Sequence, residues 1–155
     1  MPRVTTHLWF DRDAEAAAQL YTSLIPNSRI TATTRYGEGA PIPAGLVWAV
    51  NFELDGVPYH ALNGGAHFKL TEACSISVAC DTQAEIDRLW NALTADGGAE
   101  SQCGWLRDRF GLSWQIVPSA LSEWMKGPNA ARVVAAFMPM KKLDIATLER
   151  AARGG

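Results

Sequence analysis

The sequence lacks any concentration of positive charge. It has 14 Lys and Arg against 16 Asp and Glu, for a formal net charge of −2. A protein that binds nucleic acid neutralises phosphates with a basic patch or stripe, and no stretch of this chain gathers Lys and Arg in that way. We therefore expect no nucleic-acid partner.

Long apolar runs are also missing. No window approaches the roughly 20 uninterrupted apolar residues of a membrane helix. The first residues, Met1 to His7, have no basic stretch followed by an apolar one, as a secretory signal would. We expect no membrane partner and a cytoplasmic location.

Cysteine is scarce, and its spacing carries no metal or disulfide signature. The three cysteines are Cys74, Cys80 and Cys103, an odd number with no Cys-x-x-Cys pair and no zinc-finger spacing to histidine. We interpret them as reduced, small core residues.

The chain also lacks a nucleotide cradle. No strand is followed by a glycine-rich loop and an acidic ribose partner of the kind that holds adenosine cofactors. Asn63-Gly64-Gly65 has no following Lys-Ser/Thr, which a phosphate-binding loop requires. We interpret that segment as a connection between two modules.

What the chain does contain is enough apolar material for one folded domain. Of its 155 residues, 48% are hydrophobic and 19% charged, a composition typical of a packed core. We expect a single domain over residues 1–155.

The first half has the element order βαβββ. A possible cap at Asp11 precedes a helical run from Ala14, and Asp55-Gly56 is a hairpin turn. The expected strands are residues 4–10, 29–36, 46–54 and 57–62.

The second half repeats this order. We expect strands at 75–80, near Glu100, at 103–109 and at 112–117, with a helix that opens in Asp81–Glu85 and runs to about Ala95. An offset of seventy residues aligns Asp11 with Asp81 and Glu15 with Glu85, which supports an internal duplication. The modules span about 3–65 and about 74–118, and a helical tail over 119–155 follows, with Ser119 as its first cap.

Several segments carry a resemblance to a known family. They are Leu8–Asp11, Ala14–Ala16, Phe52–Gly56, Ala61–Gly65, Cys80–Gln83 and, most specific, Cys103–Pro118. The chain resembles the PhnB-like branch of the glyoxalase/bleomycin-resistance/dioxygenase (vicinal oxygen chelate) superfamily, a branch that carries the 3-demethylubiquinone-9 3-methyltransferase label.

The resemblance implies an α+β fold. Two βαβββ modules form a curled, cup-like mixed sheet with helices outside, and here C-terminal helices are added. It also implies a homodimer, in some relatives formed by exchanging modules.

Strand alternation divides the side chains between the helix side and the cup. On the helix side we expect the larger apolar residues, which are Trp48, Val50, Phe52, Ile76, Val78, Cys80, Leu112, Trp114 and Ile116. On the cup side we expect Ala49, Asn51, Glu53, Ser75, Ser77, Ala79, Ser113, Gln115 and Val117, with His7 and Trp9 added by the seventy-residue offset. A slip of one residue would exchange the two faces.

The candidate ligand-binding residues come from this cup face. They are His7, Trp9, Asn51, Glu53, His60, Ser75, Ser77, Trp105 and Gln115. Trp105 is either a stacking platform for a flat ligand or a core residue, and His60 is either a ligand contact or a histidine bonded within its strand.

A metal site is implied by the relatives but poorly matched here. In metal-using relatives four cup positions supply His and Glu, and the resemblance places them at Thr5, His60, Ser75 and Gln115. His60 is a good ligand, whereas the Gln115 amide binds a transition metal weakly, and His7 would have to swing in. We expect no cofactor and no tightly held metal, with His60, His7 and Gln115 as the weak candidates for a divalent ion.

Three functions remain open. We favour binding of a small, partly aromatic or apolar molecule in the cup. The alternatives are a metal-dependent enzyme of the lyase, isomerase or dioxygenase type, and the methyltransferase of the family label, which the missing adenosine loop disfavours. The sequence leaves open whether any reaction is catalysed and which molecule is bound.

Overall fold

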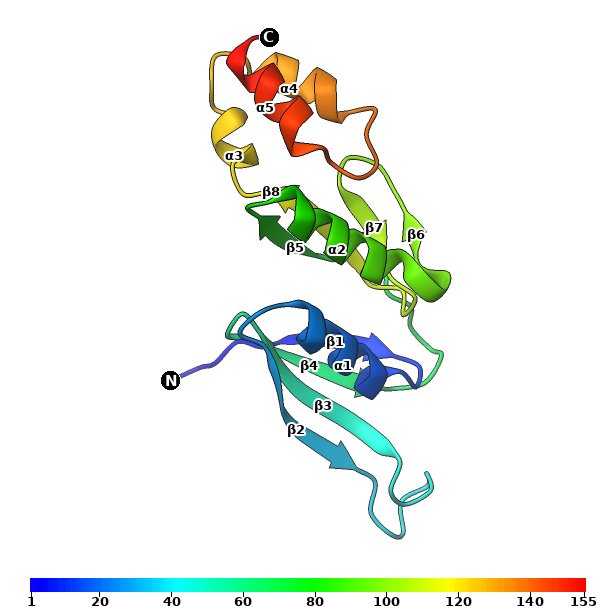
Figure 1. Cartoon of the computed structure of the whole chain (residues 1–155). Coiled ribbons are helices and arrows are strands. Elements are labelled where there is room, and N and C mark those ends of the chain that lie inside the picture. The colour runs from blue at the N-terminus through cyan, green and yellow to red at the C-terminus, as the bar shows by residue number, and fades with distance from the viewer. The chain divides into compact units, whose positions relative to one another are not determined.

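The computed structural model describes residues 1–155, which divide into two compact units, Met1–Leu70 and Thr71–Gly155 (Figure 1). Each unit combines a four-stranded mixed sheet with at least one helix, so the α+β class is confirmed. None of the helices has the length and apolar character needed to span a membrane. A shared cup and a homodimer concern how units and chains are placed, and both stay predictions.

The first unit is the expected βαβββ module. Its elements are β1 (Thr6–Phe10), α1 (Ala14–Leu24), β2 (Arg29–Arg35), β3 (Val47–Leu54) and β4 (Val57–Asn63). The sheet order is β1-β4-β3-β2; β1 runs parallel to β4 and the other pairs are antiparallel.

The second unit repeats this topology strand for strand. Its elements are β5 (Ser75–Cys80), α2 (Gln83–Thr94), a 3-10 turn η1 (Ala95–Gly97), β6 (Ala99–Glu100), β7 (Trp105–Arg107) and β8 (Ser113–Pro118). The order β5-β8-β7-β6, with β5 parallel to β8, matches that of the first sheet. His7 lies opposite His60 in the first sheet, as Ser77 lies opposite Gln115 in the second.

The core of the first unit lies between α1 and one face of its sheet. The buried residues are Leu8, Phe10, Val50, Phe52, Leu54 and Ala61 from the strands, and Ala14, Ala17, Ala18 and Tyr21 from α1. The small alanines let α1 lie close to the strands. Because α1 is the one helix of this unit, the opposite face, here called the open face, carries none.

Trp48 departs from the expected alternation. It was predicted to pack on the helix side, yet it is 48% exposed, whereas Ala49 is 4% exposed instead of facing the cup. The cause is a β-bulge: the pairing of β2 with β3 passes from Thr34–Ala49 to Arg35–Val47, which leaves Trp48 without an opposite residue. An extra residue in one strand shifts the alternation locally.

Asp11 was predicted as a possible cap of α1, and the structure shows a different residue in that role. The Ala14 N–H donates to the Asn63 side-chain oxygen at 2.9 Å, from the end of β4. The Asn63 amide nitrogen also donates to the Val47 carbonyl oxygen at 3.1 Å. One side chain from a distant strand therefore ties the helix to two strands of the sheet.

The tail folds as three short helices that belong to the second unit. They are α3 (Leu121–Trp124), α4 (Ala130–Phe137) and α5 (Ile145–Arg153), and they pack around Val133, Leu143, Leu148 and Ala151. The predicted Ser119 cap is wrong, because the Ser119 hydroxyl donates to the Asp81 carboxylate at 2.6 Å and α3 has no side-chain cap.

The three cysteines are free, but only Cys80 is a core residue. Cys74 is exposed, since it lies in the segment that precedes β5 and not within a strand, so its predicted burial is wrong. Burial raises the pKa of the Cys80 thiol to about 11. Cys103 and Gly104 have positive φ angles of 58° and 83°, which is why β7 begins at Trp105 and is shorter than predicted.

Candidate functional site

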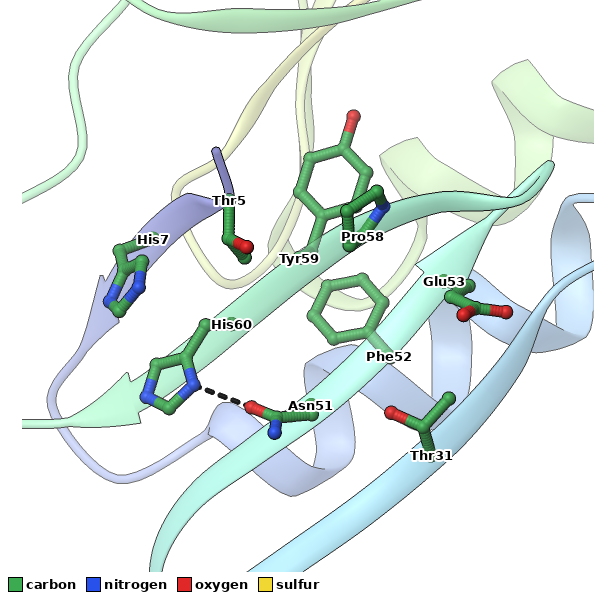
Figure 2. Close-up of a pocket in the computed structure, with 9 residues that line it drawn as sticks. All are labelled: Thr5, His7, Thr31, Asn51, Phe52, Glu53, Pro58, Tyr59 and His60. Carbon is green, nitrogen blue, oxygen red and sulfur yellow. Dashed lines mark hydrogen bonds between the residues drawn. The ribbon is translucent and has the colours of Figure 1, made fainter. Parts of the chain in front are cut away.

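Three polar side chains meet at the centre of the open face of the first sheet (Figure 2). His7, His60 and Asn51 come from the neighbouring strands β1, β4 and β3, and His60 is the direct register partner of both others. The sheet register therefore brings together residues that are far apart in sequence.

The two histidines stack, and Asn51 fixes the orientation of one of them. The ring centroids of His7 and His60 are 4.3 Å apart, with 27° between the ring planes. His60 Nδ1 lies 2.5 Å from Asn51 Oδ1. Because a carbonyl oxygen only accepts, Nδ1 donates, and Nε2 is the acceptor of the neutral ring.

The surroundings keep the His60 ring neutral at neutral pH. Burial, and secondarily the charge of His7, lower the pKa of His60 below its ordinary value of 6.5. A neutral imidazole with one bare nitrogen can accept a hydrogen bond or a proton from a bound molecule.

A hollow of about 260 Å³ surrounds this group. It is lined by Thr5, His7, Thr31, Asn51, Phe52, Glu53, Pro58, Tyr59 and His60. Glu53, predicted to orient a ligand, pairs with Arg29 across the strands at 3.1 Å, so its charge is already neutralised. Thr31 and Arg29 escaped prediction, because nothing in their local sequence marks them.

A second hollow of about 1080 Å³ lies further along the same unit and contains the predicted Trp9. Trp48 and Tyr36 also line it. Sequence reasoning missed both, since Trp48 reaches this face only through the bulge in β3.

The candidates of the second unit occupy the corresponding positions of its sheet. Gln115 pairs with Ser77 on one side and with Trp105 on the other, as His60 pairs with His7 and Asn51. The Gln115 amide donates to the Ser75 hydroxyl at 2.9 Å. This group is polar and uncharged.

The donor groups within either unit fit a metal ion poorly. The lone pairs of an imidazole lie in its ring plane, so two nearly parallel rings cannot both direct a bond of about 2 Å to one ion. No group of three or more His, Cys, Asp or Glu side chains is placed to hold a metal. The expectation of no tightly held metal stays a prediction.

Solved structures define the class of protein. The chain matches a PhnB protein from Bacillus cereus that carries the 3-demethylubiquinone-9 3-methyltransferase label, with 33% identity, a TM-score of 0.68, and coverage of 75% of this chain and 99% of that one. Protein PA1353 from Pseudomonas aeruginosa (22% identity, TM-score 0.60, coverage 76% and 98%) shares the fold. So does the fosfomycin resistance protein FosX from Listeria monocytogenes (14% identity, TM-score 0.55, coverage 79% and 94%).

The family follows from a second comparison. The model of the 3-demethylubiquinone-9 3-methyltransferase family matches residues 2–117, and the chain belongs to that family. The predicted resemblance to the PhnB-like branch that carries this label is thereby confirmed. The match ends before α3, so the helical tail lies outside it. A comparison with the curated proteins gives no match.

Proposed function

We propose that this protein binds a small molecule on the open face of its first sheet, with His60 Nε2 as the hydrogen-bond acceptor and without a tightly held metal ion. The observation that carries the proposal is the contact between His60 Nδ1 and Asn51 Oδ1, at 2.5 Å. It assigns the ring proton to Nδ1 and leaves Nε2 to a bound hydroxyl or N–H group.

The surroundings support this role. Small-molecule sites combine apolar walls with a few polar groups that fix orientation, and Pro58, two residues before His60 on β4, gives this hollow an apolar wall beside the polar group. The lowered pKa of His60 keeps the acceptor uncharged at neutral pH.

Neither enzymatic alternative has comparable support. A metal-dependent reaction would need the two stacked imidazoles to part before they could share an ion. A methyltransferase would need a cradle for its adenosine cofactor, and the connections from β1 to α1 and from β5 to α2, residues 11–13 and 81–82, contain no glycine.

The hydrogen bond is tested with phenol and anisole, probes that share a ring and differ in the donor. We expect phenol to bind the full chain about two- to tenfold more tightly than anisole, the range of one hydrogen bond, in ligand-observed NMR titrations. His60→Ala should remove the difference, and the matched variant His67→Ala should preserve it. Equal affinities for the two probes in the unchanged protein would contradict the proposal.

The metal content is tested separately by elemental mass spectrometry of the purified protein. We expect far less than one equivalent of any transition metal per chain, in both the unchanged protein and His60→Ala. One equivalent in the unchanged protein, lost in the variant, would support the metal-dependent alternative instead.

A further inference from the structure

The larger hollow of the first unit is walled by aromatic rings. Trp9 comes from β1, Trp48 from β3 and Tyr36 from the residue after β2, and all three line the hollow of about 1080 Å³. The rings of Tyr36 and Trp48 lie 6.1 Å apart and tilted by 37°. Three rings around one hollow offer a large apolar area with few rotatable bonds.

Trp9 is held rigidly in this wall. Its Nε1 donates to the Gly65 carbonyl oxygen at 2.9 Å, and its ring packs edge-on against Phe68, with 4.9 Å between the centroids. Gly64 lies so close to the ring that a Cβ atom there would overlap it. The position of the ring is therefore set before any ligand arrives.

Trp48 is exposed because a bulge interrupts the pairing of β2 with β3. The bulge that leaves it unpaired breaks the β2–β3 ladder, and the side chain is 48% exposed. Bulges are common beside binding sites, where they redirect a side chain. An exposed tryptophan beside a hollow has apolar area that a ligand can cover.

The charged groups at this hollow cancel one another. Arg35 and Glu15 form an ion pair at 3.2 Å, and Arg12 lies 3.8 Å from Asp11. Arg35 also donates to the Gly45 carbonyl oxygen at 3.1 Å, which ties the β2–β3 connection to the rim. The hollow therefore offers rings without net charge, which favours an uncharged ligand.

We propose that this hollow binds a flat, uncharged aromatic ring system of about two fused rings, belonging to the same molecule whose polar group reaches His60. The inference rests on the proposed function, because both hollows lie on one unit: Trp9 is two residues beyond His7 on β1, about 7 Å along a strand. A two-ring system spans that length. Its planar faces fit between rings that a saturated molecule of equal size would contact less well.

The test compares 2-naphthalenemethanol with decahydro-2-naphthalenemethanol, which have the same carbon skeleton and differ in planarity. Because both carry the same aliphatic CH2OH donor, the contribution of His60 cancels in their ratio. We expect the full chain to prefer 2-naphthalenemethanol by roughly three- to tenfold in ligand-observed NMR titrations, the range of one aromatic contact. Trp48→Leu should abolish this preference, and Val57→Ala, a change at another exposed apolar residue of the unit, should keep it.

The two proposals fail separately. A preference for the aromatic probe that is absent, or that survives Trp48→Leu, overturns the aromatic hollow while the phenol–anisole difference still tests His60. His60→Ala should weaken the binding of both CH2OH probes equally and leave their ratio unchanged. Should Trp48→Leu fail to fold, Tyr36→Leu replaces it with the same expected loss, and an unchanged ratio there overturns the inference as well.

Discussion

The indole ring of Trp9 lies directly on the backbone of Gly64. A Cβ atom added at Gly64 would overlap the ring atoms Cζ2, Cε2 and Cη2 of Trp9. The Gly64 N–H also donates to the Phe10 carbonyl oxygen at 2.9 Å, so the backbone under the ring is tied to the end of β1. Glycine is needed here for close approach.

Gly64→Ala is therefore expected to displace Trp9 and to lower the free energy of unfolding by about 1–3 kcal/mol, the usual cost of overpacking. Urea unfolding followed by tryptophan fluorescence measures both effects. Gly37→Ala is the matched control, because a Cβ atom at Gly37 meets nothing within 4 Å. Equal unfolding free energies for the two variants would show that the Trp9 ring moves away at no cost.

An NMR titration of His60 should reveal both causes of its lowered pKa. Burial and the charge of His7 lower the pKa of His60, so NMR titration should give a value below 6.5. His7→Gln removes the second cause and keeps much of the ring volume, so it should raise the pKa of His60 towards, but not up to, its ordinary value. An unchanged pKa in that variant would assign the whole shift to burial.

The same shift has a consequence for stability. A histidine whose pKa is lower in the folded chain contributes stability above the unfolded pKa and loses it as the pH falls through the folded pKa. Urea unfolding from pH 7.5 to pH 4.5 should therefore show a decline that begins near 6.5. His60→Gln should make this decline shallower, and an identical slope in the variant would exclude His60 as a source of it.

Much of the fold follows from the sequence, because it depends on local patterns. The alternation in Ser75–Cys80 and the repeat at seventy residues predicted the strands, their order and the face that carries His7. The bulge at Trp48 and the cap at Asn63 were missed, since each depends on a partner from a distant strand. For the same reason the sequence predicted the histidines on one face but neither their stacking nor the aromatic hollow.

Cys103–Pro118 is the segment that carries the resemblance to the family most specifically, and near its centre Asp108 holds a turn in place. The Asp108 carboxylate, only 1% exposed, accepts from the Phe110 and Leu112 N–H groups at 2.9 and 3.1 Å and from Trp114 Nε1 at 2.9 Å. These contacts hold the turn between β7 and β8 against the buried Trp114.

Asp108→Asn should lower the free energy of unfolding by about 2–3 kcal/mol, because the amide replaces one acceptor oxygen with a donor that faces other donors. The control is Asp96→Asn, at an aspartate whose side chain is 77% exposed and pairs with Arg109 at the surface. That change should cost less than about 1 kcal/mol. Comparable costs in chemical unfolding would contradict the assignment of the turn to Asp108.

The helical tail is fastened to the second unit although the family match ends before it. The Gln83 side chain, at the start of α2, donates to the Leu143 carbonyl oxygen at 3.1 Å and accepts from the Ile145 N–H at 2.8 Å. Gln83→Ala leaves both backbone groups without their hydrogen-bond partner, so we expect the free energy of unfolding to fall by about 1–3 kcal/mol. We also expect faster tryptic cleavage after Lys142, whose ammonium pairs with Asp87 at 2.7 Å. Gln19→Ala, an exposed helical position in α1, should change neither. Equal cleavage rates in the two variants would mean that the tail is held by its apolar contacts alone, and the hydrogen bonds of Gln83 would then contribute nothing to its docking.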